Sequence, residues 1–277
     1  MIIGVDLGGT NARAGLVKDS TIIETREVKL SHKYSQEETL DELYSIIAPL
    51  TQFDIEGIGI GVPSIVDAEK GIVYDVVNIP SWKKVELKTI LEKKFGLPVF
   101  VNNDVNCLAL GEQLFGKASA FSSFVALGIG TGLGAAIVID RKLYNGILCG
   151  SGEIGYIPYL DKNLEYYASG MYFEGFGTTA YQAFESALDG QPKALEMWNT
   201  YGHHLGQVIK VVMYTYAPEA IIIGGGISAA YPFFERSMLL GIGDFIFPET
   251  LHHVTILPSL VKNISIMGAA ALVHSNR

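Results

Sequence analysis

The chain has 277 residues, 49% of them hydrophobic and 18% charged, which is the composition of a globular protein rather than of a disordered or collagen-like one. A formal net charge of −9 at pH 7 argues against nucleic acid as the main partner, because an acidic surface repels phosphate backbones. No apolar run approaches the ~20 residues that span a bilayer and no basic leader precedes Ile2, so we expect no membrane partner and a cytoplasmic location.

The first half of the chain alternates between strand and helix patterns. Apolar or alternating runs predict three antiparallel strands joined by tight turns, over residues 2–5, 12–17 and 21–29. A capping-box pattern at Ser35 and apolar residues at helical spacing predict a helix that ends before Pro49. Four further elements are predicted, namely a strand over 55–62, a helix over 86–95, a short strand over 99–101 and a helix over 105–115.

The second half repeats this plan. It predicts strands over 124–127 and 135–139, helices over 172–188 and 192–216, a strand over 219–223 and an Ala-rich helix over 264–274. Gly9-Thr10 and the strand after it match Gly130-Thr131 and the strand after it, and residues 56–61 resemble residues 219–224. A buried strand before a glycine turn is common, but two such matches indicate an internal duplication, and hence two similar α/β lobes with a cleft between them.

Residues 6–13 join the first two predicted strands. Gly8 and Gly9 let the backbone approach a ligand and turn its amides toward an anion, while Thr10 adds a hydroxyl and Arg13 a charge, so the segment suits a phosphate. Asp6, at the end of the strand, is suited to hold Mg²⁺ through water. A plain hairpin is the alternative, and it leaves the carboxylate at the end of a buried strand unexplained.

Two other glycine-rich segments resemble nucleotide-binding motifs in part. Residues 128–134 lack the third glycine of the dinucleotide fingerprint and precede a strand instead of a helix. Residues 111–118 end in Ala118, where a phosphate loop has the Ser or Thr that binds Mg²⁺, and they follow a helix pattern. We interpret the second segment as a helix that ends at Gly116.

Polar residues after the predicted strands suggest a catalytic site. Asp104 lies between a short strand and a helix, where it could cap the helix or accept a proton from an attacking hydroxyl, and both readings stay open. Glu153, Tyr156 and Glu165 suit a sugar, since carboxylates pair with hydroxyls and aromatic rings cover apolar faces, although solvated loop charges are the alternative. Histidines 203–204 and 252–253 are adjacent pairs, and adjacent side chains on a helix or strand point in different directions. We therefore interpret them as structural or surface residues rather than as ligands.

Taken in order, these segments resemble the ROK (repressor, open reading frame, kinase) family of sugar kinases, within the actin, Hsp70 and hexokinase fold group. The matching segments span nearly the whole chain and lie at residues 6–10, 103–106, 130–134, 152–155 with 165–170, and 224–226. The resemblance implies an α/β, two-lobed actin/hexokinase-like (ribonuclease H-like) fold with a mixed sheet in each lobe and a cleft between. We expect a small lobe over 1–107, with the C-terminal helix 263–277 packing back on it, and a large lobe over 108–262.

The resemblance also implies an activity. This activity is ATP-dependent phosphorylation of a hexose hydroxyl, with glucose 6-phosphate as the leading product. N-acetylmannosamine, fructose or another hexose is the alternative substrate, and a non-catalytic sugar-sensing regulator is the alternative function. The implied cofactors are ATP and Mg²⁺, the implied partners are a small sugar and a nucleotide, and a homodimer is the assembly found in many family members.

Roles follow from the same resemblance, residue by residue. Asp104 would be the general base. The residues implied to bind the sugar are Ser64, Asn103, Asp104, Glu153, Tyr156 and Glu165. Those implied to bind the nucleotide or its phosphates are Asp6, Gly8, Gly9, Thr10, Arg13, Gly130, Thr131, Gly132, Gly225 and Gly226, with Asp6 also holding Mg²⁺ through water.

The chain departs from the family pattern in two places. Tyr156 stands where the family has a histidine, and the cysteine-rich zinc box that follows it in the family is absent between Tyr156 and Glu165. With only Cys107 and Cys149, the chain cannot build a four-cysteine zinc site, so we expect no zinc. No helix-turn-helix precedes the strand that begins at Ile2, so direct DNA binding is the least favoured role.

Overall fold

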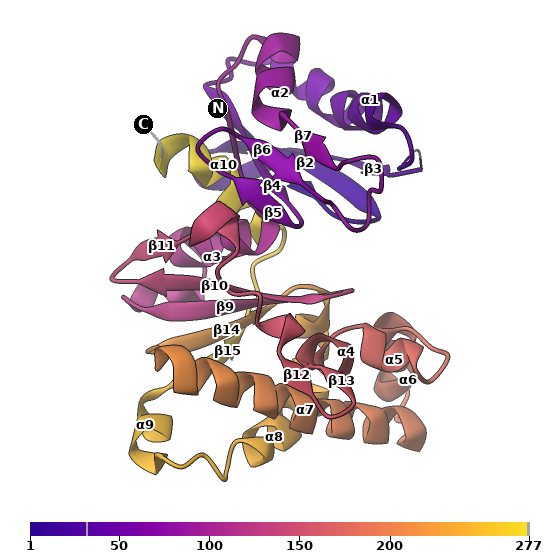
Figure 1. Cartoon of the computed structure of the whole chain (residues 1–277), viewed down its shortest axis with the longest axis vertical. Helices are drawn as coiled ribbons and strands as arrows, with labels where there is room; N and C mark the ends of the chain where they lie inside the picture. The colour runs from indigo at the N-terminus through magenta and orange to yellow at the C-terminus, as the bar shows by residue number, and fades with distance from the viewer. Residues whose placement is uncertain (32, 276–277) are drawn as a thin grey trace. The chain divides into compact units, whose positions relative to one another are not determined.

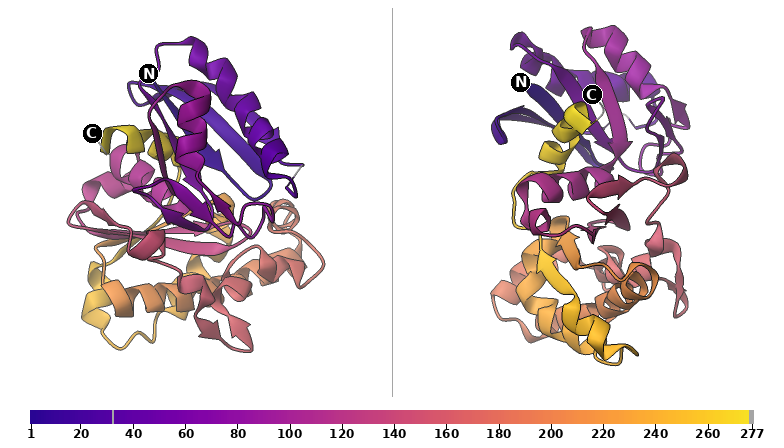
Figure 2. Two further views of the ribbon diagram at one scale, coloured as in Figure 1. Left: turned by 45° about the horizontal axis from the view of Figure 1, so that its top comes forward. Right: turned by 90° about the vertical axis from the view of Figure 1, so that its left-hand side faces the viewer.

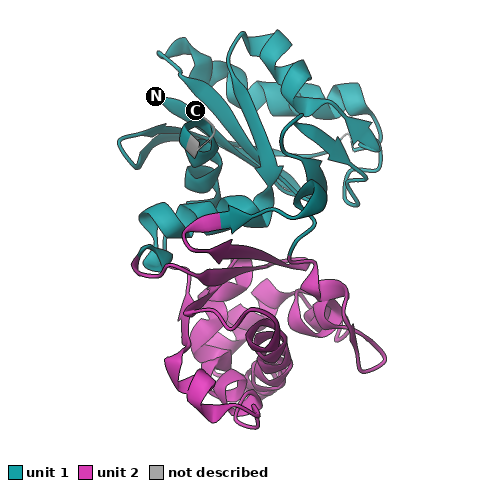
Figure 3. Cartoon of the chain, turned by 60° about the vertical axis from the view of Figure 1, so that its left-hand side comes forward, with its two compact units in different colours: residues 1–119, 143–151, 261–277 teal, residues 120–142, 152–260 magenta. Residues whose placement is uncertain are grey.

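The computed structural model describes residues 1–31 and 33–275 of the chain (Figure 1). These residues form two compact units, which Figure 3 shows in different colours. Unit 1 comprises Met1–Ser119, Leu143–Ser151 and Val261–Arg277, and unit 2 comprises Ala120–Lys142 and Gly152–Leu260. Among the helices of the described residues, none combines the length and the apolar character needed to cross a membrane.

Unit 1 is built on a five-stranded mixed sheet in the order β3-β2-β1-β4-β8. The strands are β1 (Ile2–Leu7), β2 (Asn11–Lys18), β3 (Thr21–Lys29), β4 (Gly57–Val62) and β8 (Val99–Asn103). The first three are antiparallel, as their patterns predict, whereas β4 pairs in parallel with β1 and β8 in parallel with β4. The carboxyl ends of β1, β4 and β8 therefore meet at one edge of the sheet.

Glycines in this sheet allow the last helix to pack directly on it. The helix α10 (Ile264–Ser275) lies against β1 and β4, as both views of Figure 2 show. A Cβ added at Gly4 would lie 2.0 Å from the carbonyl oxygen of Ile266, and one added at Gly59 would lie 1.8 Å from that of Ala269. A side chain at either position would push α10 off the sheet.

Three further helices belong to unit 1, namely α1 (Gln36–Ile47), α2 (Leu87–Phe95) and α3 (Asp104–Phe115). The Ser35 side chain caps α1 by accepting a hydrogen bond from the backbone N–H of Glu38, as the capping-box pattern predicts. Because α3 packs against α10, unit 1 continues past residue 107 to Ser119. Gly116 ends α3, which agrees with the interpretation of residues 111–118 as a helix end.

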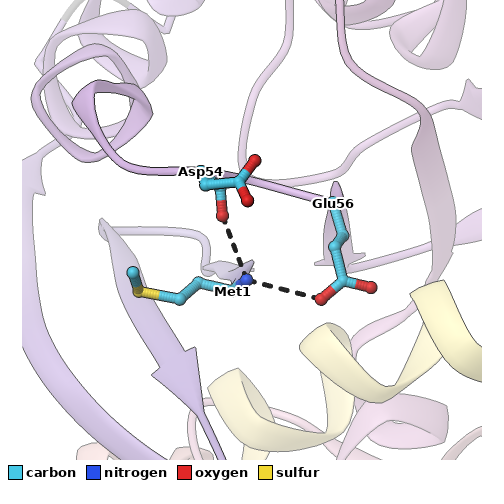
Figure 4. A network of polar contacts seen from close by, with 3 residues as sticks. All are labelled: Met1, Asp54 and Glu56. Atoms are coloured by element: carbon cyan, nitrogen blue, oxygen red, sulfur yellow. Dashed lines mark hydrogen bonds and ion pairs between the residues drawn. The ribbon is translucent and has the colours of Figure 1, made fainter.

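A small three-stranded sheet, absent from the sequence predictions, follows β4. It consists of β5 (Ile65–Asp67), β6 (Ile72–Tyr74) and β7 (Lys84–Val85), and the short helix η3 (Ile147–Cys149) packs on β5. At the other end of the main sheet, the amino group of Met1 donates to the Asp54 carbonyl oxygen at 3.0 Å and lies 3.4 Å from Glu56 Oε1 (Figure 4). These contacts tie the start of β1 to the segment that leads into β4.

Unit 2 repeats the sheet of unit 1 in topology, in the order β11-β10-β9-β14-β15. Four of the strands belong wholly to unit 2, namely β9 (Phe124–Ile129), β10 (Leu133–Ile139), β14 (Ala220–Gly224) and β15 (Thr255–Pro258). The fifth, β11 (Lys142–Tyr144), begins at the last residue of a unit 2 segment, and its other two residues are counted in unit 1. As β1 does in unit 1, β9 pairs antiparallel with the strand after it and in parallel with a later strand, β14. The internal duplication is therefore confirmed, and so is a mixed sheet in each unit.

The helices of unit 2 show where the sequence predictions were right and wrong. The long helix α7 (Pro192–Tyr216) has the predicted bounds and packs against α8 (Tyr231–Gly241), which was not predicted. The single helix predicted over 172–188 is wrong, because the chain forms α5 (Met171–Glu174) and α6 (Ala180–Leu188). Gly177 between them has φ +71°, a left-handed conformation that a continuous helix does not allow.

Other elements of unit 2 were also not predicted. They are the hairpin of β12 (Pro158–Tyr159) and β13 (Lys162–Asn163), the helix α4 (Leu164–Ala168), the helix α9 (Pro248–His253) and the edge strand β15.

Candidate active site

The carboxyl edge of the unit 1 sheet gathers the polar residues predicted at strand ends. Asp6 on β1 pairs in register with Gly61 on β4, and Gly61 pairs with Asn102 on β8. One residue further, Val62 pairs with Asn103, immediately before Asp104. The parallel pairing of these three strands thus brings Asp6 and the segment 102–104 to the same edge.

The first glycine turn joins β1 to β2 at this edge. The Gly8 N–H donates to the Asn11 carbonyl oxygen at 2.9 Å, and the Leu30 N–H donates to the Thr10 carbonyl oxygen at 2.8 Å. A Cβ added at Gly9 would lie 2.6 Å from Nδ2 of Asn78. The turn is therefore a hairpin packed from outside by later segments, and the second glycine is required by a close approach.

Charged side chains accompany the turn. Arg13 donates to Asp6 Oδ2 at 2.5 Å, and the Asp6 side chain is 14% exposed against 43% for Arg13. Lys33 Nζ donates to the Gly9 carbonyl oxygen. Sequence reasoning missed Lys33 and the Asn78 contact, because both lie in separate loops and neither belongs to a local motif.

At the turn from β8 to α3, the structure corrects the capping assignment. Asn103, not Asp104, is the N-cap, because its Oδ1 accepts hydrogen bonds from the backbone N–H groups of Val105 at 2.9 Å and Asn106 at 3.3 Å. Asp104 is the first helical residue, and its Oδ1 accepts from the Val105 N–H at 2.9 Å. The helix cap therefore does not depend on the Asp104 carboxylate.

Ser64 lies on the loop after β4 and is linked to this turn. Its backbone has φ +90°, which is strained for a residue with a side chain. Its hydroxyl lies 2.9 Å from the Tyr74 carbonyl oxygen and 3.1 Å from that of Asp75, and its own carbonyl accepts from Asn103 Nδ2 at 3.2 Å. Asn103 therefore holds the loop of Ser64 and the start of α3 together.

In unit 2, the second glycine turn joins β9 to β10, so a strand follows it and the dinucleotide fingerprint is correctly excluded. The Gly130 carbonyl accepts from the Gly170 N–H at 2.7 Å, and the Thr131 carbonyl accepts from the Ser169 hydroxyl at 3.1 Å. Glu165 Oε2 accepts from the Leu133 N–H at 2.8 Å. The start of α5 and the helix α4 therefore hold this turn.

Three of the predicted sugar-binding residues interact electrostatically in unit 2. Burial and the nearby charge of Glu165 raise the pKa of Glu153, although the residue is exposed at the surface of unit 2. Burial and the charges of Glu165 and Glu153 likewise raise the pKa of Tyr156, whose side chain is exposed. Glu153, Tyr156 and Glu165 therefore form one acidic cluster around the second turn.

Gly225 follows β14 beside the end of β9. It has φ +82°, and an added Cβ would lie 2.2 Å from the Ile129 carbonyl oxygen. Gly224 pairs in register with Gly128, so the segment 225–226 leaves the sheet next to the second glycine turn. Only glycine allows the two backbones to approach so closely.

His204, one of the paired histidines, has structural contacts. Its Nδ1 lies 3.1 Å from the Tyr159 hydroxyl, and its ring packs on those of Tyr159, Tyr167 and Tyr172. Within residues 1–31 and 33–275, no three His, Cys, Asp or Glu side chains come together as a metal-binding group.

Residues 2–276 match the ROK family. The chain belongs to this family. Among its ROK relatives, the glucokinase of Thermotoga maritima is 29% identical over 308 residues, covering 98% of this chain and 96% of that protein. The xylose repressor of Bacillus spizizenii is 27% identical over 300 residues, covering 98% of this chain and 76% of that protein.

A ROK family glucokinase from Streptomyces griseus, solved in complex with glucose and AMPPNP, has the same fold. It superposes with a TM-score of 0.88 at 26% identity, over 99% of each chain. The actin/hexokinase-like fold implied by the sequence motifs is therefore confirmed. The family and its named relatives include both kinases and repressors, so the residues of the site must decide between the two roles.

Proposed function

We propose that this chain is an ATP-dependent sugar kinase that transfers the terminal phosphoryl group of ATP to a hexose hydroxyl, with glucose as the leading substrate. The observation that carries the proposal is the β8–α3 turn, where Asn103 caps the helix and Asp104 is not needed for the cap. The Asp104 carboxylate accepts from the Val105 N–H, which Asn103 also binds, and a carboxylate at this position suits a general base. Glucokinases among the relatives support the choice of sugar.

In this proposal, Asp104 accepts the proton of the sugar hydroxyl while the hydroxyl oxygen attacks the terminal phosphorus of ATP. The bond from that phosphorus to the bridging oxygen breaks, and ADP leaves. Phosphoryl transfer requires alignment and charge neutralisation more than covalent chemistry from the protein. The turn at Gly8, Gly9 and Thr10 would supply backbone amides to the phosphates. Lys33, which already lies on the Gly9 carbonyl, adds a positive charge that the sequence motifs do not include.

The residues of unit 1 fit Mg²⁺ bound mainly by phosphate and water. Mg²⁺ at phosphoryl-transfer sites commonly takes one or two carboxylates and fills its remaining positions with phosphate oxygens and water. Asp6 offers one mostly buried carboxylate at the strand end, steadied by Arg13. When bound, the ion would neutralise phosphate charge beside this turn.

The family resemblance assigns sugar-binding roles to Glu153, Tyr156 and Glu165 in unit 2. It assigns the same role to Asn103 and Ser64 in unit 1. One amide N–H of Asn103 already donates to Ser64, so its second N–H is the group proposed for a sugar hydroxyl. Tyr156 presents a phenol where most of the family has an imidazole. This difference makes N-acetylmannosamine, fructose or another hexose the alternative substrate.

The nucleotide would bind on the second turn and the segment after β14. Gly130, Thr131 and Gly132 would face the phosphates, and Gly225 and Gly226 would lie near the adenosine. The close approach of Gly225 to the Ile129 backbone supports this assignment, since it brings the segment after β14 next to the second turn.

A panel of hexoses tests the proposal. ADP release would be measured with ATP, Mg²⁺ and each sugar in turn, and we expect sugar-dependent release that is greatest with glucose. Sugar binding by calorimetry without any phosphorylated product would instead indicate a sugar-sensing regulator. Faster turnover of another hexose would keep the kinase and change the substrate.

A further inference from the structure

A buried polar cluster lies behind the β8–α3 turn and has no role in the proposed chemistry. Its centre is the side chain of Asn102, which is 5% exposed. Asn102 Oδ1 accepts from the Asn103 N–H at 2.8 Å, from Asn106 Nδ2 at 2.9 Å and from Cys149 Sγ at 3.2 Å. Asn145 Oδ1 accepts from Asn106 Nδ2 at 3.2 Å and from Asn102 Nδ2 at 3.4 Å. We call these four side chains, Asn102, Asn106, Asn145 and Cys149, the asparagine cluster.

Two members of the cluster come from Leu143–Ser151, a segment of unit 1 that is distant in sequence from β8 and α3. Its backbone is unusual, because Leu148 and Cys149 have φ values of +53° and +55° although neither is glycine. Such conformations persist where surrounding contacts enforce them. Here the contacts are η3 on β5 and the Cys149 thiol on Asn102.

The thiol acts in this cluster as a hydrogen-bond donor. Burial raises the pKa of Cys149, which keeps the sulfur protonated and able to donate to Asn102. Asn106 is 1% exposed and donates to two neighbours, so both hydrogens of its amide NH2 group are used in the cluster. Buried polar groups satisfied in this way fix one conformation, since any other leaves a donor or an acceptor unpaired.

The cluster acts on the peptide that joins Asn102 to Asn103, one residue before Asp104. The Asn103 N–H is held by Asn102 Oδ1, while the Asn103 side chain caps α3 and reaches Ser64. Three consecutive residues therefore have different structural roles at the turn. Asn102 binds the Asn103 N–H and Asn103 caps the helix. Asp104 lies between Asn103 and Val105, whose backbone N–H groups are both bonded.

We propose that Asn145 is a positioning residue for Asp104, acting through Asn102 and Asn106 to fix the β8–α3 turn in its catalytic conformation. This inference rests on the proposed function, because it assigns Asn145 to the step that Asp104 performs. Asn145 is the member best suited to a test. It is only partly buried and lies in a connecting segment, so its replacement should not prevent folding.

The test compares Asn145→Ala, which removes the acceptor oxygen, with Asn145→Asp, which keeps it. Ile147→Ala is the matched control, since Ile147 lies in the same segment, is 88% exposed and is outside the cluster. Because small displacements of a reacting group are costly, we expect kcat of Asn145→Ala to fall about 10-fold to 100-fold, with KM for ATP changed by less than about 2-fold. Asn145→Asp should stay within about 5-fold of the parent because its carboxylate still accepts both hydrogen bonds.

Amide hydrogen exchange gives a second readout that does not need activity. We expect faster exchange in peptides covering residues 101–107 for Asn145→Ala, and parent-like exchange for Ile147→Ala. An unchanged kcat for Asn145→Ala, or equal losses in the Ala and Asp variants, would overturn the inference.

The exchange experiment also separates the two proposals. If the parent phosphorylates no sugar, the proposed function fails. The rate of amide exchange in residues 101–107 then decides alone whether Asn145 orders the turn. Parent-like exchange in Asn145→Ala would show that Asn145 does not order it.

Discussion

The replacement Asp104→Asn tests the assignment of the general base most directly. Asparagine has nearly the same size and can still accept the hydrogen bond from the Val105 N–H, but it cannot take a proton. General-base catalysis contributes about 10²-fold to 10⁴-fold, so kcat should fall by at least ~10²-fold, or about 2.7 kcal/mol in the barrier.

The stability of the variant should change little, because the cap of α3 belongs to Asn103. Only the negative charge at the helix N-terminus is lost, which costs about 0.3–1 kcal/mol. For a chain of this size, such a loss lowers Tm by no more than about 4 °C. The assay is ADP release at saturating sugar and ATP, together with a thermal melt followed by circular dichroism.

Asn103→Ala is the matched comparison for stability. It removes the cap, at about 0.5–2 kcal/mol, and also the hydrogen bond to the Ser64 carbonyl, so it should melt at a lower temperature than Asp104→Asn. If Asp104→Asn kept activity within a few-fold of the parent at an equal Tm, Asp104 would have no part in proton transfer. The kinase assignment would then lose its main support.

Four further predictions concern the turns, the acidic cluster and metals. Gly132→Ala places a Cβ 2.6 Å from Glu165 Oε2 and should raise KM for the sugar several-fold by displacing that carboxylate, and an unchanged KM would contradict this. The pKa of Glu153 is raised in the folded chain, so the stability linked to its proton is present below the unfolded pKa and is lost as pH rises through the folded one. Glu153→Gln should therefore raise Tm relative to the parent at pH 8 and change it little at pH 4, and an equal shift at both pH values would contradict this reasoning. Lys33→Met should raise KM for ATP while Lys33→Arg restores it, and a lower Tm with an unchanged KM would reduce Lys33 to a structural role. Elemental analysis of the purified protein should find no stoichiometric zinc, and activity lost in EDTA should return with Mg²⁺ alone.

Much of the fold could be predicted because its signals are local. The alternation of the first strands, the capping box at Ser35 and the glycine turns all lie within a few residues of the structure they specify. The helix α8 gave no capping signal, since its N-cap Ala230 has no capping side chain. The helix predicted over 172–188 was wrong because apolar spacing continues through Gly177 while the backbone cannot.

Local sequence signals do not predict which of Asn103 and Asp104 is the N-cap of α3. Both residue types are preferred N-caps, so composition does not distinguish them. The register of β8 determines which of the two residues is the cap. Asn103 still pairs with Val62 as a strand residue, so it enters the helix from an extended conformation. That register depends on β4, about 40 residues earlier in the chain, and on the α/β packing that aligns the two strands.

The two glycine turns show the same division between local and distant information. The turns repeat in topology, yet different side chains hold them. Lys33 lies on the first, and Glu165 accepts from the backbone beside the second. The first turn therefore carries a positive charge, which suits the phosphate proposed to bind there, whereas the second is bonded to a carboxylate proposed to hold the sugar. Because one hydrogen bond joins Glu165 to the second turn, binding of the sugar and of the nucleotide should be energetically coupled in unit 2. The glycines that allow this arrangement are visible in the sequence, but their partners in loops far along the chain are not.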